Sequence, residues 1–208
     1  MASVLNEVFG ELLENYGANE LSKSLQISNK TVIPNDDQIY NYVGLENIES
    51  NSGKLIYFQP TSGKEIKSSK VIFKKGMVLY GKLRPYLNKV WIASFDGVAT
   101  TEILPFYPIN ENILNMHYVK YYFLSPIYLN KVITNCNGAR MPRLTTSFIY
   151  SKEANIPLSP LPIQHKVVIY LDKISQKMQQ VKLLQTKKME NLKALKASIL
   201  DKAFRGEL

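Results

Sequence analysis

The last quarter of the chain carries its clearest hydrophobic pattern. Apolar residues recur there with spacings that alternate between four and three, which is the heptad pattern of a helix that packs against another long helix. No Gly or Pro lies between Ile163 and Arg205. We therefore predict one helix of roughly forty residues, about 60 Å long at 1.5 Å per residue. The predicted seam of this helix consists of Val167, Leu171, Ile174, Met178, Val181, Leu192, Leu195 and Ile199.

The centre of this seam is interrupted by two polar residues, Gln185 and Lys188. Polar residues at seam positions lower stability but can fix the register or the orientation of the partner helix. The alternative is that Leu184 and Met189 take over the seam for one turn. In either case the stripe requires a second long helix, and no other segment of the sequence predicts one.

The rest of the chain predicts shorter elements. A short amphipathic helix fits Val4 to Tyr16, and a helical stretch dense in core aromatics fits Ile113 to Val132, with a break or kink at Pro126. Strands are expected in the β-rich middle, at Ile39–Gly44, Leu55–Phe58 and Val71–Phe73. The predicted fold class is α+β: a β-rich globular domain over residues 1–160, followed by one long coiled-coil helix over 161–208.

Two glycine-bearing basic loops are the candidate binding elements. Apolar strands flank the first loop, and Pro142 and Gly138 argue against a helix in the second. Lysine and arginine can neutralise DNA phosphates or pair with guanine, and asparagine can pair with adenine. Tyr86 has a packing role as its alternative. The candidate DNA contacts are Lys82, Arg84, Tyr86, Asn88 and Lys89 in the first loop, and Arg140, Arg143 and Thr145 in the second.

The charge of the chain is unevenly distributed. The net charge is +9, and residues 64–89 alone contribute +7. Such a basic block favours a polyanionic partner, whereas the basic residues of the long helix fit a solvated face better. A single cysteine, Cys136, excludes a disulfide framework. With no targeting signal and no apolar run of roughly eighteen residues, we expect a cytoplasmic protein without a membrane partner.

The catalytic motifs of common enzyme classes are absent from the sequence. Neither a glycine-rich phosphate loop nor a nucleophile elbow occurs, and His117, His165 and Cys136 form no zinc pattern. Glu65 and Lys67, preceded by Asp36 and Asp37, loosely resemble the metal site of a small nuclease, but a basic surface strand explains them better. We expect a binding protein that is not an enzyme and holds no metal or cofactor of its own.

Several separate motifs, in the same order, resemble the specificity subunits of type I restriction-modification systems. They are Gly76–Lys89 followed by Val98–Glu102, Gly138–Leu144 followed by Ile156–Gln164, and the closing Ser198–Leu208. The resemblance implies a non-catalytic subunit that binds double-stranded DNA through target recognition domains held apart by antiparallel helices. It also implies modification subunits that bind S-adenosylmethionine and methylate adenine, and restriction subunits that can join them.

The sequence departs from the usual form of that family, which has two recognition domains and two spacer helices in one chain. One of each is present here, which matches the unpaired seam. We therefore predict an antiparallel homodimer that reads two identical, inverted half-sites, with the helix length setting the gap between them. A split subunit or a truncated chain, paired with a different recognition domain, is the alternative. A function from another class is a coiled-coil interaction or scaffold protein without specific DNA binding.

Overall fold

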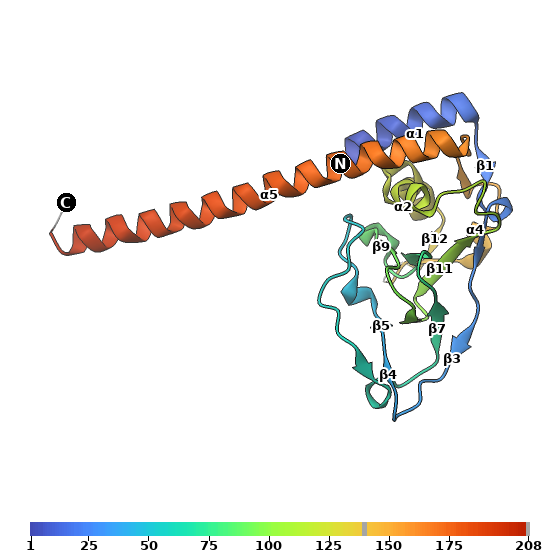
Figure 1. The fold of residues 1–208 in the computed structure, drawn as a ribbon, viewed down its shortest axis with the longest axis horizontal. Coiled ribbons are helices and arrows are strands. Elements are labelled where there is room, and N and C mark those ends of the chain that lie inside the picture. The colour runs from blue at the N-terminus through green and yellow to red at the C-terminus, as the bar shows by residue number, and fades with distance from the viewer. Residues whose placement is uncertain (139–140, 207–208) are drawn as a thin grey trace. The chain divides into compact units, whose positions relative to one another are not determined.

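A computed structural model of the chain describes residues 1–138 and 141–206. The chain divides into two compact units, Ala2–Val168 and Ile169–Leu208 (Figure 1). The first unit contains all the strands of the described residues and the first eight residues of the long helix, 161–168.

The helices follow the hydrophobic periodicity closely. Asn115 caps α2, and Ser125 both ends α2 and caps α3, directly before Pro126. A proline is tolerated in the first turn of a helix, so Pro126 separates two helices here and does not kink one. The α-helices are α1 (Ala2–Tyr16), α2 (Met116–Leu124), α3 (Pro126–Thr134), α4 (Thr146–Ile149) and α5 (Leu161–Phe204), and the 3-10 helices are η1 (Leu21–Lys23), η2 (Leu45–Asn47), η3 (Gly63–Glu65) and η4 (Pro85–Leu87).

Two four-stranded sheets form the centre of the first unit. One has the order β3-β7-β10-β5, antiparallel except for the β10–β5 pair, and the other is antiparallel with the order β2-β11-β8-β9. Their strands are β3 (Thr31–Val32), β7 (Lys70–Phe73), β10 (Gly97–Ala99), β5 (Tyr42–Val43), β2 (Leu25–Ile27), β11 (Ile103–Pro108), β8 (Val78–Gly81) and β9 (Val90–Ile92). Three two-stranded ladders pair β1 (Asn19–Glu20) with β14 (Asn155–Ile156), β4 (Ile39–Tyr40) with β6 (Thr61–Ser62), and β12 (Cys136–Asn137) with β13 (Arg143–Leu144).

The core has one part that mixes aliphatic and aromatic side chains and one part that is aromatic. Strands of both sheets contribute Val43, Phe73, Leu79 and Trp91 to one cluster of buried side chains. The aromatic part consists of fully buried rings from α1, α2, α3 and the strands, with edge-to-face and stacked contacts among them, as aromatic rings prefer. Its members are Phe9, Tyr80, Phe106, Tyr118, Tyr122, Phe123 and Tyr128. The predicted core role of the α2 and α3 aromatics is therefore confirmed.

The helices cover one end of the first unit. In Figure 1, α2 lies between α1 and the strands, and Phe9 of α1 contacts the rings of Tyr118 and Tyr122 at 5.3 and 5.2 Å. The start of α5 is fixed by the buried side chain of Gln164, which donates to the carbonyls of Ile113 and Ser159. The strands β3, β4, β5 and β7 lie at the opposite end of this unit.

One predicted strand was wrong. Residues 55–58 form no named strand, and Leu55 makes only an isolated bridge to Ile48. The reason is local: Tyr57 has a left-handed backbone with φ of 50°, which the pleated geometry of a strand does not accommodate. The α+β class and the long C-terminal helix are confirmed, as is the short helix at the start of the chain.

The second unit consists of α5 from Ile169 onward. Its seam residues Met178, Val181, Leu192, Leu195 and Ile199 are 45–56% exposed in the single chain. Leu184 and Met189, the alternative central seam residues, are 66% and 56% exposed. The seam residue Leu171 is buried and Ile174 is half-buried, so among the described residues the apolar stripe predicted from the sequence has no cover only from Met178 onward. Among the described residues, no helix has the length and apolarity that crossing a membrane requires.

Candidate nucleic-acid interface

The two predicted basic loops lie side by side. Leu83 and Arg143 form an antiparallel bridge, although they are far apart in the sequence. On either side of this bridge, the Arg84 amide donates to the Pro142 carbonyl at 2.8 Å and the Leu144 amide donates to the Lys82 carbonyl at 2.9 Å. These two backbone hydrogen bonds form the bridge and join the loops into one surface, which we call the loop-pair surface and define as residues 82–86 and 141–144.

Arg84 stands at the start of a strained turn in this surface. Its φ of 49° is left-handed, and so is that of Asn88 at 47°; the 3-10 turn η4 lies between them. A non-glycine residue in this conformation costs about 1–2 kcal/mol, and such residues cluster at functional sites. The hydrogen bond to Pro142 fixes the Arg84 backbone, while its side chain is exposed. Tyr86 in the same turn is 50% exposed.

Arg143 is oriented by an acidic residue. Its Nη2 lies 3.0 Å from Oε1 of Glu102, and the Arg143 side chain is 55% exposed. A pair this exposed contributes at most about 1 kcal/mol to stability, so its main effect is to direct the guanidinium. The second oxygen of Glu102, Oε2, is buried and has no hydrogen-bond partner within the described residues. The Lys82 amide donates to the Glu102 carbonyl, so Glu102 connects to both loops.

The expectation that Asn88 pairs with adenine does not fit its position. Asn88 is only 1% exposed, and its Nδ2 donates to the Leu124 carbonyl at the end of α2. The left-handed conformation, which asparagine tolerates better than most residues, directs this side chain into the fold. We therefore assign Asn88 to the structure of the turn and remove it from the candidate contacts.

Lys89 also has a structural position. Its Nζ donates to the carbonyls of Leu45 at 2.7 Å and Ile48 at 2.8 Å, at the end of η2. A lysine near a helix end can satisfy the last carbonyls, which have no partner within the helix. Close packing accompanies these bonds, because a Cβ on the neighbouring Gly81 would come within 2.8 Å of Leu45. Lys89 therefore holds η2 against the first loop, and its ammonium is occupied.

The remaining candidates in the two loops are Lys82, Thr145 and the arginines. Lys82 is half-buried at the base of the loop-pair surface, and Thr145 is the N-cap residue of α4, where its Oγ1 accepts a hydrogen bond from Ser147. Arg140 lies outside the described residues. The structure thus leaves Arg84 and Arg143 as the exposed arginines of this surface.

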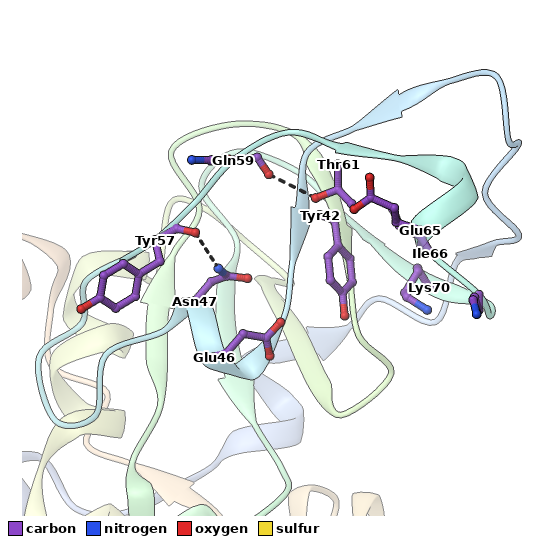
Figure 2. A pocket seen from close by; sticks show the side chains of 10 residues that line it. Tyr42, Glu46, Asn47, Tyr57, Gln59, Thr61, Glu65, Ile66 and Lys70 are labelled. Atoms are coloured by element: carbon purple, nitrogen blue, oxygen red, sulfur yellow. Dashed lines mark hydrogen bonds between the residues drawn. The ribbon is translucent and has the colours of Figure 1, made fainter.

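A polar pocket of about 430 Å³ lies at the end of the domain that carries β4 and β5 (Figure 2). Burial, and then the nearby Glu46 carboxylate, raise the pKa of Tyr42 in this pocket. Lys70 is buried, which lowers its pKa, and its Nζ donates to the backbone and side-chain oxygens of Ser68. The pocket is lined by Tyr42, Glu46, Asn47, Tyr57, Gln59, Thr61, Glu65, Ile66, Lys67 and Lys70.

The nuclease hypothesis gains nothing from this pocket. Glu65 and Lys67 line it, but Asp36 and Asp37 do not. Over the part of the chain that the structure describes, no three His, Cys, Asp or Glu side chains lie close enough to hold a metal ion. The residue that sequence reasoning missed here is Tyr57, because its left-handed backbone is visible only in the structure.

The comparisons with known proteins agree with this fold. Residues 15–191 match the family described as type I restriction modification DNA specificity domain. Because this match covers most of the chain, the chain belongs to that family. Its sequence is 28% identical, over 98% of this chain, to the specificity subunit of the type I restriction enzyme EcoDI from Escherichia coli.

Solved structures share the fold. The HsdS subunit from Thermoanaerobacter tengcongensis superposes with a TM-score of 0.70 over 86% of this chain, at 20% identity. A chain from a study of complex assembly and conformational transition of the type I R-M system gives a TM-score of 0.72 over 86% of this chain, also at 20% identity. This chain spans less than half of these proteins: 44% of the EcoDI subunit and 46% of each structure.

Proposed function

We propose that this chain reads one half of a bipartite DNA sequence for a type I restriction-modification complex, through the loop-pair surface. The observation that supports the proposal is the bridge between Leu83 and Arg143, which joins the backbone segments that carry two exposed arginines, Arg84 and Arg143. Arginine neutralises phosphates and pairs bidentately with guanine, so this face has the chemistry for both affinity and sequence reading.

In this proposal the chain forms an antiparallel homodimer through α5. The uncovered stripe of the helix supports it, since residues such as Val181 and Leu195 are 53% and 56% exposed without a partner. Twofold symmetry would make the DNA target two identical, inverted half-sites. A second recognition domain on a different chain would cover the same stripe and would produce two unlike half-sites.

The chain supplies recognition in this scheme and does not catalyse. Methyl transfer from S-adenosylmethionine to adenine belongs to the recruited modification subunits, and DNA cleavage belongs to restriction subunits where these join. Family membership supports these roles.

The first test is selection of bound sites from a random duplex library, with the purified chain alone and with a cognate modification subunit. Enrichment of an inverted repeat with a fixed gap is the expected result. Two unlike halves would point to a heterologous partner. No enrichment in either case would overturn the proposal and favour the coiled-coil scaffold function.

The second test separates phosphate contacts from base reading at Arg84. Arg84→Ala should weaken specific binding by about 1–3 kcal/mol and reduce the slope of log affinity against log salt by about 1. Arg84→Lys should keep the slope but relax the base preference, because lysine lacks the bidentate fork. Arg205→Ala, which removes an arginine that lies outside the loop-pair surface, is the matched control. Unchanged binding by Arg84→Ala would remove this residue from the interface.

A further inference from the structure

Tyr57 has an unusual position for an aromatic side chain. It is 90% exposed, more than any other large hydrophobic side chain among the described residues. Its backbone is left-handed, which is rare for a bulky residue and requires support from the surrounding structure. Figure 2 shows the ring extending from the rim of the polar pocket, away from Tyr42. An exposed ring on a constrained backbone points to a contact surface.

Asn47 supplies that support. Its Nδ2 donates to the Tyr57 carbonyl at 3.1 Å and to the Ile56 carbonyl at 3.4 Å, while its Oδ1 accepts from the Gly44 amide at 2.9 Å. The Ile56 amide returns a hydrogen bond to the Asn47 carbonyl at 2.8 Å. One side chain at the end of η2 thus holds the loop that presents Tyr57.

The same short helix is held against the Arg84 turn. Lys89 donates to the Leu45 and Ile48 carbonyls on one side of η2, as described above. The Asn51 amide, in the loop between η2 and Tyr57, donates to the Asn88 carbonyl at 3.1 Å. A continuous set of hydrogen bonds therefore connects Tyr57, through η2, to the turn that carries Arg84. The backbone segments that carry the two exposed side chains are therefore held in one framework.

The groups around Tyr57 have the chemistry of a nucleobase contact. The adjacent pocket is lined mainly by polar side chains that include both hydrogen-bond acceptors, such as Glu46, and donors, such as Lys67. An apolar protein surface would leave these groups unpaired, which is costly. A nucleobase offers a flat ring face for stacking and polar edges for hydrogen bonds, and stacking on aromatic residues is a common mode of nucleic-acid binding.

We propose that Tyr57 is a further DNA-contact residue, which stacks on a base that has left the stack of the recognised duplex, and that Asn47 and Lys89 are positioning residues that fix it relative to Arg84. The inference rests on the proposed function and extends its contact surface beyond the two basic loops. It assigns to Tyr57 a contact that carries no charge.

The test measures affinity for the selected DNA site over a range of salt concentrations, with the full chain and its modification subunit. Tyr57→Ala should weaken binding by about 5-fold to 150-fold, the equivalent of about 1–3 kcal/mol for one stacked base. The salt slope should stay unchanged, because tyrosine displaces no counterions. Tyr57→Phe, which keeps the ring, should bind as the wild type does. Ile33→Ala, at another exposed apolar side chain (80%), is the matched control.

A double-mutant cycle tests the positioning role. Asn47→Ala should weaken binding when Tyr57 is present and have little further effect in the Tyr57→Ala background, because its effect acts through Tyr57. Equal losses in both backgrounds would overturn this role.

The outcomes separate this inference from the proposed function. Wild-type affinity for Tyr57→Ala would overturn the stacking contact and leave the proposed function standing. A loss of affinity in Tyr57→Phe as large as that in Tyr57→Ala would have the same consequence. Reduced assembly with the modification subunit, at unchanged DNA affinity, would show that Tyr57 contacts protein. Absence of any specific DNA binding by the wild type would overturn both proposals.

Discussion

Large apolar side chains are mostly buried in the domain over Ala2–Val168 and mostly exposed in the helix beyond it. In the domain, rings such as Phe123 and Tyr128 are completely buried. In the helix, Leu195 and Ile199 are about half exposed, at 56% and 47%, and Phe204 is 88% exposed. The domain supplies its own core, whereas the apolar stripe of the helix from Met178 onward is exposed in the single chain. A strong hydrophobic pattern indicates that its apolar residues are suited to burial. Only the three-dimensional fold shows whether residues of the same chain bury them.

Charges placed in the seam of α5 should have the largest effect on the difference between the two regions. Leu192→Glu with Leu195→Glu should weaken self-association by about 100-fold or more, because an uncompensated buried charge costs about 3–5 kcal/mol. Sedimentation velocity would measure the association, and the melting of the domain should not change. Gln179→Glu with Gln180→Glu adds the same charge outside the seam and should leave the dimer intact. Equal self-association of both double variants would place the interface elsewhere.

Two phenylalanines offer a direct comparison of the regions. Phe123→Ala should destabilise the domain by about 3–5 kcal/mol, since it leaves a cavity among packed rings. Phe204→Ala, at the exposed end of α5, should change the stability of the domain by less than about 0.5 kcal/mol. Urea unfolding followed by far-UV and near-UV signals would give both values. Similar losses for the two variants would contradict the division into units.

The buried hydroxyl of Tyr80 predicts a smaller effect that depends on pH. Burial raises the pKa of Tyr80 far above its ordinary value, and the hydroxyl has no hydrogen-bond partner within the described residues. The unfolded chain therefore loses this proton from about pH 10 upward while the native domain keeps it, so stability falls as the pH rises. Tyr80→Phe should reduce this loss by about 1.4 kcal/mol per pH unit above pH 10.

At neutral pH, Tyr80→Phe should be neutral or stabilising by about 1 kcal/mol, since it removes an unsatisfied polar group. Denaturant unfolding at a series of pH values would measure both effects. An identical pH profile for the two proteins would show that the Tyr80 hydroxyl ionises alike in the native and unfolded chains, which would contradict the raised pKa.

Much of the fold followed from local patterns. The boundaries of α5 and the break before Pro126 are set by periodicity and by helix-ending residues, which act over a few positions. The pairing of β10 with the distant strand β5, and the bridge between Leu83 and Arg143, depend on contacts between remote segments. No local pattern specifies such contacts, so the sequence predicted two basic loops but not the surface that they form together.

The candidate site shows the same limit at the level of single residues. Sequence reasoning selected Asn88 and Lys89 for their chemistry, which suits DNA, but their side chains bind backbone carbonyls of this chain. The direction of a side chain depends on backbone conformation and on which carbonyls lack a partner. The sequence predicts a strand at Tyr57, because aromatic residues favour strands. Its positive φ leaves no signature in composition.

The pairing of β1 with β14 sets an order of events during synthesis. Asn19 and Glu20 pair with Ile156 and Asn155, and the Leu21 amide donates to the Ala154 carbonyl at 2.8 Å. The strand β1 therefore cannot pair with β14 until residue 156 has left the ribosome. Long-range pairing of this kind is slow, whereas a helix forms in about a microsecond. The seam of α5 follows residue 156 in the chain, so it leaves the ribosome after every strand of the described residues.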